Sequence, residues 1–81
     1  MARRALGEAH ETTLQMRWNY ALALYKDAGA TLDDLREAVT TLEDLERTAR
    51  RVLGGAHPIT KGIEHTLRDA RAALRARETP P

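Results

Sequence analysis

The spacing of apolar residues between about Glu8 and Ala28 predicts a long amphipathic helix. Apolar side chains recur there at i, i+4, i+7, i+8 and i+11, which places them on one face of an α-helix. These side chains are Leu14, Trp18, Ala21, Leu22 and Tyr25. Gly29 can adopt the left-handed conformation that often closes a helix, so the helix is expected to end near the AGAT segment.

A second helix is predicted from about Leu32 to Leu53. Thr31 offers an N-cap hydroxyl, and acidic residues follow where the helix dipole favours negative charge. Spacings of 3, 4, 3, 3, 4 and 3 form one apolar stripe of Leu32, Leu35, Val39, Leu42, Leu45, Ala49 and Val52. Arginines in the last turns and the glycine pair at 54–55 mark the end of this helix.

A third helix is predicted from Pro58, which suits a first helical turn, with His57 near the N-cap. Its apolar face has spacings of 4, 3 and 4 and consists of Ile63, Leu67, Ala70 and Leu74. The helix is expected to end at ETPP. Three helices joined by short turns pack antiparallel, so the sequence predicts an all-α, up-down-up fold in a single domain, 1–81. Trp18 and Tyr25 are expected in the core between the first two helices.

A nine-residue phrase occurs twice, as ARRALGEAH at 2–10 and ARRVLGGAH at 49–57. Seven positions are identical, the copies are 47 residues apart, and each precedes an amphipathic helix. A repeat at such a distance is typical of stacked helical repeats. The form RRVLGGAHP followed by a helix resembles the segment that joins kinesin-light-chain-like tetratricopeptide repeats. The positions of Trp18, Leu22, Tyr25 and Gly29 roughly match that family's pattern.

The resemblance implies about one and a half tetratricopeptide repeats. Residues 2–10 would be the tail of a preceding repeat's second helix, 11–57 a helix pair, 58–78 a third, capping helix and 79–81 a tail. It also implies a non-catalytic protein-interaction or scaffold module that binds a protein or peptide. Because such arrays normally have more repeats, an exposed flank is expected at the first helix, through which the chain could form a homodimer.

The net charge of +1 conceals an asymmetry between the two parts of the chain. Residues 1–46 contain five basic and nine acidic side chains, whereas residues 47–81 contain eight basic and three acidic ones. In an antiparallel bundle, the end of the third helix would return beside the start of the second. We therefore expect Arg68, Arg71, Arg75 and Arg77 to face Asp33, Asp34 and Glu37.

Few residue patterns point to catalysis or a cofactor. The chain contains neither cysteine nor serine, and its histidines, His10, His57 and His65, are scattered over separate segments without metal-ligand spacing. The expectation is therefore no enzyme activity, no cofactor and no metal, with His57 serving at a helix start. No apolar run approaches the length of a membrane span, and a secretory signal is not evident, which favours a cytoplasmic protein.

Two groups of residues are candidates for partner binding. Tyr20 points away from the predicted core, and Arg68, Arg71 and Arg75 form a basic stripe at i, i+3 and i+7. The candidate residues are Met16, Arg17, Tyr20, Lys26, Arg68, Arg71 and Arg75. A self-associating helical bundle and a small basic nucleic-acid-associated protein remain the alternatives. Nucleic acid is the less favoured partner because no aromatic residue interleaves with these arginines for base stacking.

Overall fold

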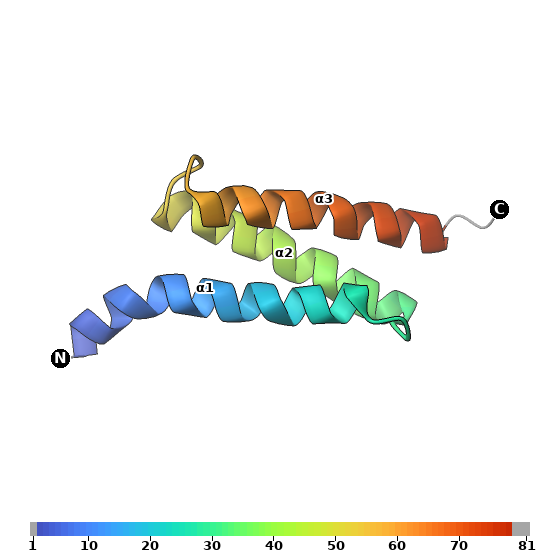
Figure 1. Cartoon of the computed structure of the whole chain (residues 1–81), viewed down its shortest axis with the longest axis horizontal. Coiled ribbons are helices and arrows are strands. Elements are labelled where there is room, and N and C mark those ends of the chain that lie inside the picture. Colours follow the sequence, from blue (N-terminus) through green and yellow to red (C-terminus); the bar gives the residue numbers. More distant parts are fainter. Residues whose placement is uncertain (1, 79–81) are drawn as a thin grey trace.

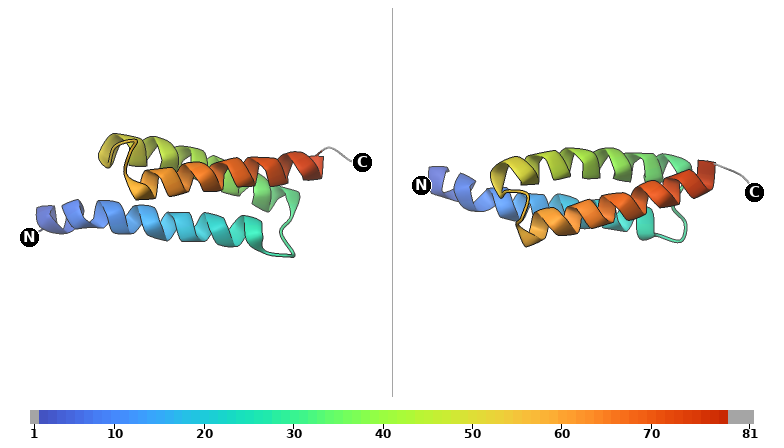
Figure 2. Two further views of the ribbon diagram at one scale, coloured as in Figure 1. Left: turned by 45° about the horizontal axis from the view of Figure 1, so that its top comes forward. Right: turned by 90° about the horizontal axis from the view of Figure 1, so that it is seen from above.

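Three antiparallel helices build the chain, α1 (Ala2–Lys26), α2 (Leu32–Val52) and α3 (Pro58–Glu78) (Figure 1). The computed structural model describes the backbone of residues 2–78 and the side chains of residues 11–78. Successive helices run in opposite directions and lie side by side in every view (Figure 2). The predicted all-α, up-down-up fold is confirmed.

The hydrophobic core follows α2, which packs along both other helices, whereas α1 and α3 meet over a shorter stretch. Leu42, Leu45 and Ile63 are completely buried at its centre. The core also includes Leu14, Ala21, Val39, Ala49, Ile59, Leu67 and Ala70. The 3.6-residue periodicity therefore identified most of the core positions on all three helices.

Local capping interactions set both ends of α2 and the start of α3 as the sequence predicted, whereas Gly29 does not adopt the left-handed conformation that was expected to close the first helix. The Thr31 hydroxyl accepts from the backbone N–H of Asp34 at 3.1 Å, and the Asp34 carboxylate accepts from the N–H of Thr31, forming a capping box. At the other end of α2, Gly54 has φ +93°, a conformation that other residues adopt only with strain. His57 Nδ1 then accepts from the N–H of Ile59 at 3.1 Å and caps α3.

Some packing predictions were wrong. Val52 remains 39% exposed because it is the last residue of α2, where the chain turns towards α3. Trp18 is only partly buried and packs against α3, where its Nε1 donates to the Thr66 hydroxyl at 3.0 Å. Thr60 and Thr66 are also buried, although neither was predicted in the core because their side chains are polar. Thr66 meets its hydrogen-bonding need by donating to the carbonyl of Gly62.

The two copies of the repeated phrase adopt different structures. The second copy spans the end of α2, the glycine turn and the residue before α3, whereas the first lies wholly within α1. The predicted helix start near Glu8 is therefore wrong, and residues 2–10 continue into α1 instead of ending a separate helix. Both copies contain the glycine that turns the chain at Gly54, but Glu8 and Glu11 stand in place of Gly55 and Pro58, and glutamate can continue a helix that proline cannot.

Candidate functional site

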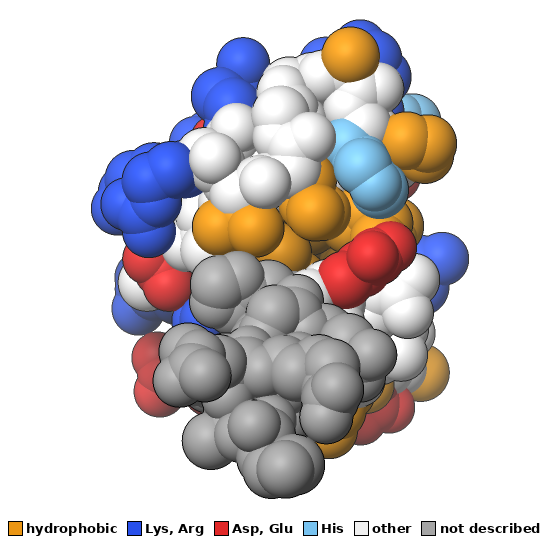
Figure 3. Space-filling model, turned by 90° about the vertical axis from the view of Figure 1, so that its left-hand side faces the viewer, with side chains coloured by type: hydrophobic (Ala, Val, Ile, Leu, Met, Phe, Trp, Pro, Cys, Tyr) orange, Lys and Arg blue, Asp and Glu red, His pale blue; other side chains and the backbone are white. Residues whose placement is uncertain are grey.

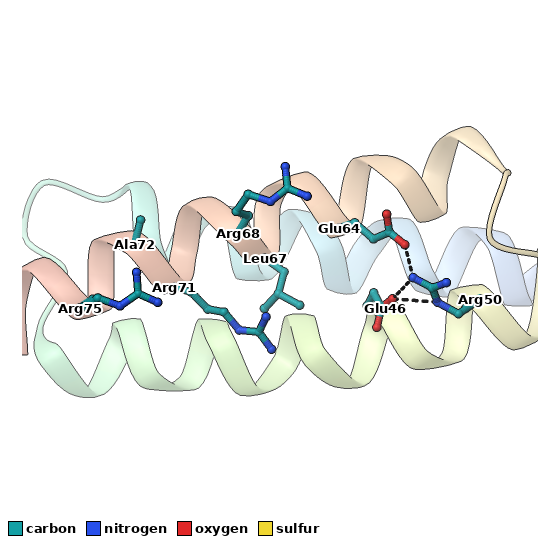
Figure 4. Close-up of a pocket in the computed structure, with 8 residues that line it drawn as sticks. All are labelled: Glu46, Arg50, Glu64, Leu67, Arg68, Arg71, Ala72 and Arg75. Carbon is teal, nitrogen blue, oxygen red and sulfur yellow. Dashed lines mark hydrogen bonds and ion pairs between the residues drawn. The ribbon is translucent and has the colours of Figure 1, made fainter.

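A groove of about 560 Å³ lies between α2 and α3 (Figure 4). Charged side chains form most of its wall, and none of its lining residues belongs to α1. The lining consists of Glu46, Arg50, Glu64, Leu67, Arg68, Arg71, Ala72 and Arg75. Four arginines and two glutamates give the groove an excess of two positive charges.

Three ion pairs join α2 to α3 at intervals of seven residues on each helix, and we call them the ion-pair ladder. They are Arg36–Glu78 at 3.3 Å, Glu43–Arg71 at 2.9 Å and Arg50–Glu64. The sign alternates along each helix, so a shift of either helix by seven residues would bring like charges together. The ladder therefore favours one register, as the charged flanks of coiled coils do.

Arg50 is held by two carboxylates at one end of the groove (Figure 4). Its Nη2 lies 2.6 Å from Glu46 Oε2 and also pairs with Glu64. The hydrogen bond and charge of Glu46, followed by the charge of Glu64, raise the pKa of Arg50 above its ordinary value. Arg50 is thus positively charged and already neutralised from within the chain.

Arg68 and Arg75 differ from the other arginines of the groove. Both are exposed, and neither forms an ion pair or hydrogen bond with any residue in the described part of the chain. Arg71 lies between them and pairs with Glu43. The structure thus brings the predicted stripe together in one groove, with two of its three guanidinium groups available to a partner.

The predicted pairing of the third helix with Asp33, Asp34 and Glu37 was wrong. Asp33 lies 3.6 Å from Arg36, whereas Asp34 caps α2 and Glu37 accepts a hydrogen bond from Tyr20. The end of α3 does lie beside the start of α2, where Arg36 pairs with Glu78, but Arg71 pairs with Glu43 further along α2. Arg77 instead donates to the carbonyl of Ala30 at 3.0 Å.

The four predicted binding residues on α1 lie outside the groove. Met16 and Tyr20 are exposed by 65% and 52%. Arg17 pairs with Asp44 at 3.0 Å, and Lys26 is exposed in the last turn. The Tyr20 hydroxyl donates to Glu37 at 2.7 Å, and this bond, together with the carboxylate's charge, raises the pKa of the phenol. The seven predicted residues therefore occupy two surfaces.

Sequence reasoning missed Glu46 and Glu64 as members of the groove, although Arg50 had been considered as an extension of the basic stripe. A signal was present, because charges alternate in sign at positions 36, 43 and 50 and again at 64, 71 and 78. Opposite charges at matching seven-residue intervals on two adjacent antiparallel helices indicate a shared flank. The prediction had considered the arginines of α3 without their possible partners on this part of α2.

The end of the molecule with the α2–α3 turn presents histidine and apolar side chains at the surface, with Lys and Arg towards the edge (Figure 3). His57 is committed to capping α3, while the exposed His65 lies 3.6 Å from Asp69. Within the described residues, no three His, Cys, Asp or Glu side chains gather as a metal site would require.

None of the helices in that same part of the chain is both long enough and apolar enough to cross a membrane. Comparison with family models, curated proteins and solved structures gave no match to the chain.

Proposed function

We propose that the chain is a non-catalytic module that binds another protein or a peptide through the groove between α2 and α3. The observation that supports this proposal most strongly is that Arg68 and Arg75 have no partner among the described residues, in a groove whose other charges are paired. A guanidinium group presents a planar fork of donors that matches a carboxylate, so two free guanidinium groups in one hollow suit an acidic protein surface.

A tetratricopeptide-like repeat of the kinesin-light-chain type is part of this proposal, as is a cytoplasmic location. The helix end, glycine turn and proline-started helix formed by RRVLGGAHP support the repeat interpretation for the second copy of the phrase. Proteins of this kind use helix faces to hold peptides, as the proposed groove would.

Nucleic acid fits the groove less well than protein does. Duplex DNA presents one negative charge per about 1.7 Å of its axis. The groove offers an excess of only two positive charges, and Glu46 and Glu64 would face the phosphates. Its lining also contains no aromatic side chain on which a base could stack.

Self-association through α1 is a second candidate function, favoured by the exposure of Met16 and Tyr20. Large apolar side chains on one flank of a helix become buried when a second copy covers them. Light scattering on a sizing column over a wide concentration range distinguishes the two candidates. A concentration-dependent dimer that Met16→Ala weakens would support self-association, whereas a monomer throughout would leave the groove as the proposed interface.

A peptide library displayed on phage and selected on the immobilised protein tests the proposed function. We expect enriched peptides to lose about tenfold or more in affinity for an Arg68→Ala/Arg75→Ala variant. The matched control is Arg51→Ala/Lys61→Ala, which removes the same charge from exposed positions outside the groove. Failure to enrich any peptide, or equal affinity for both variants, would refute binding in the groove.

A further inference from the structure

The charges of the groove identify which arginines a partner can use. Glu46 and Glu64 neutralise Arg50, and Glu43 neutralises Arg71. Binding through either of these arginines would require an existing ion pair to be replaced, so a partner gains little from them. Arg68 and Arg75 have no pair to lose within the described residues.

The spacing of these two arginines is that of two helical turns. Residues seven positions apart on an α-helix lie within about 20° of the same direction, and their Cα atoms are about 10.5 Å apart along the axis. Arg68 and Arg75 therefore leave α3 from nearly the same side of its backbone, with Arg71 and Ala72 between them along the helix (Figure 4).

We propose that the groove binds an acidic α-helix of a partner protein, in which two carboxylates seven residues apart pair with Arg68 and Arg75. A helix lying alongside α3 has the same rise per residue and so repeats its carboxylates at the same interval. This inference rests on the proposed protein-binding function, to which it adds the conformation and charge pattern of the partner.

An extended peptide fits the two arginines less well. A strand rises about 3.3 Å per residue, so about three residues span the distance from Arg68 to Arg75. Side chains three positions apart in a strand point to opposite faces, and only one of two such carboxylates could face the groove. Side chains two or four residues apart in a strand do share a face. Two residues, however, span less than the distance from Arg68 to Arg75, and four residues span more.

The remaining lining residues define where the partner's charges can lie. Ala72 provides a small exposed apolar surface between the two arginines, which suits a small apolar residue between the partner's carboxylates. Glu64 lies one helical turn before Arg68 and would repel a carboxylate that extends towards the α2–α3 turn. The acidic residues of the partner are therefore confined to the part of the groove between Arg68 and Arg75.

Two fluorescein-labelled helical peptides of identical composition test this inference by fluorescence anisotropy. One has glutamates at i and i+7, and the other has them at i and i+5, on faces about 140° apart. Circular dichroism establishes that the two peptides are equally helical. We expect the i, i+7 peptide to bind about tenfold or more tightly than its isomer. Its affinity should fall to that of the isomer with Arg68→Ala/Arg75→Ala, but not with Arg51→Ala/Lys61→Ala.

The outcomes separate this inference from the proposed function. Equal binding of the two peptides would overturn the acidic-helix inference, while library-selected peptides that still need Arg68 and Arg75 would preserve the proposed function. Failure of both the designed and the selected peptides would overturn both. Tighter binding of a DNA duplex that depends on the same arginines and falls steeply with salt would replace both with a nucleic-acid interface.

Both variants remove only exposed side chains, and their urea unfolding midpoints are compared with that of the unmodified protein. An Arg68→Ala/Arg75→Ala protein that keeps this midpoint but still discriminates between the peptides would also overturn the inference.

Discussion

At the scale of single residues, the contact between Trp18 and Gly62 determines how closely α1 approaches α3. A Cβ atom on residue 62 would lie 2.4 Å from Trp18 Cη2 and 2.8 Å from Cζ2. In a helix interior, alanine is normally more stable than glycine by about 1 kcal/mol. Forcing an extra methyl group into a packed contact, however, typically costs about 1–3 kcal/mol. We expect Gly62→Ala to lower the free energy of unfolding, as measured by urea denaturation followed through the fluorescence of the single tryptophan.

Gly29→Ala is the matched control for this prediction. The nearest atom to its added Cβ is Asp27 Oδ1 at 4.0 Å, and Gly29 does not have a positive φ. We expect this variant to be as stable as the unmodified protein or slightly more stable, because alanine restricts the unfolded chain. A Gly62→Ala protein with undiminished stability would contradict the close packing of Trp18 on α3.

At the scale of helices, the ion-pair ladder predicts a coupling between α2 and α3. Glu43→Arg places a third positive charge between Arg36 and Arg50 and opposite Arg71, so this variant should unfold at lower urea. Arg71→Glu should also be destabilised, because it places a negative charge between Glu64 and Glu78 and opposite Glu43. The double exchange restores the opposite charges of the pair, and we expect it to recover part of the loss.

A double-mutant cycle measures the coupling in this pair. Because the two side chains are 42% and 49% exposed, solvent screens their attraction, and about 0.2–1 kcal/mol is expected. Strictly additive effects of the two exchanges would show that the observed contact contributes nothing to helix pairing. Lys61→Glu, an exposed charge reversal on α3 outside the ladder, provides the control and should change stability little.

The helices could be predicted from the sequence because their signals are local. The cap formed by Thr31 and Asp34 and the turn at Gly54 depend on residues within one or two turns of each other. The first copy of the repeated phrase was predicted to be the tail of a separate helix because it resembles the second copy. The proline that follows the second copy is absent after the first, and this difference was given too little importance. Glu11 allows α1 to continue where Pro58 forces a new helix to begin.

At the scale of the whole molecule, the arrangement of the proposed binding residues could not be predicted from the hydrophobic periodicity of the sequence. A helical pattern identifies which side of a helix is buried, but it does not fix the register against a neighbouring helix. The alignment that pairs Arg71 with Glu43 therefore decided which arginines of the groove have no partner among the described residues. The same limitation left the relative positions of Tyr20 and Arg68 open, and the structure places them on separate surfaces.

The core shared by all three helices predicts that α1 and α2 do not fold without α3. Leu42 and Leu45 have no exposed surface in the complete bundle, and they belong to the same core cluster as Ile63 and Leu67. A fragment of residues 1–55 would lose the α3 side of this core, and isolated helices of such length are marginal in water. We expect its circular dichroism to show a large loss of helix and no cooperative thermal transition. Adding a peptide of residues 58–78 should restore both, since it returns Ile63 and Leu67 to the core, whereas the same peptide with Ile63→Asp should not. Cooperative unfolding of the 1–55 fragment alone would instead show that the α1–α2 hairpin is a self-sufficient unit.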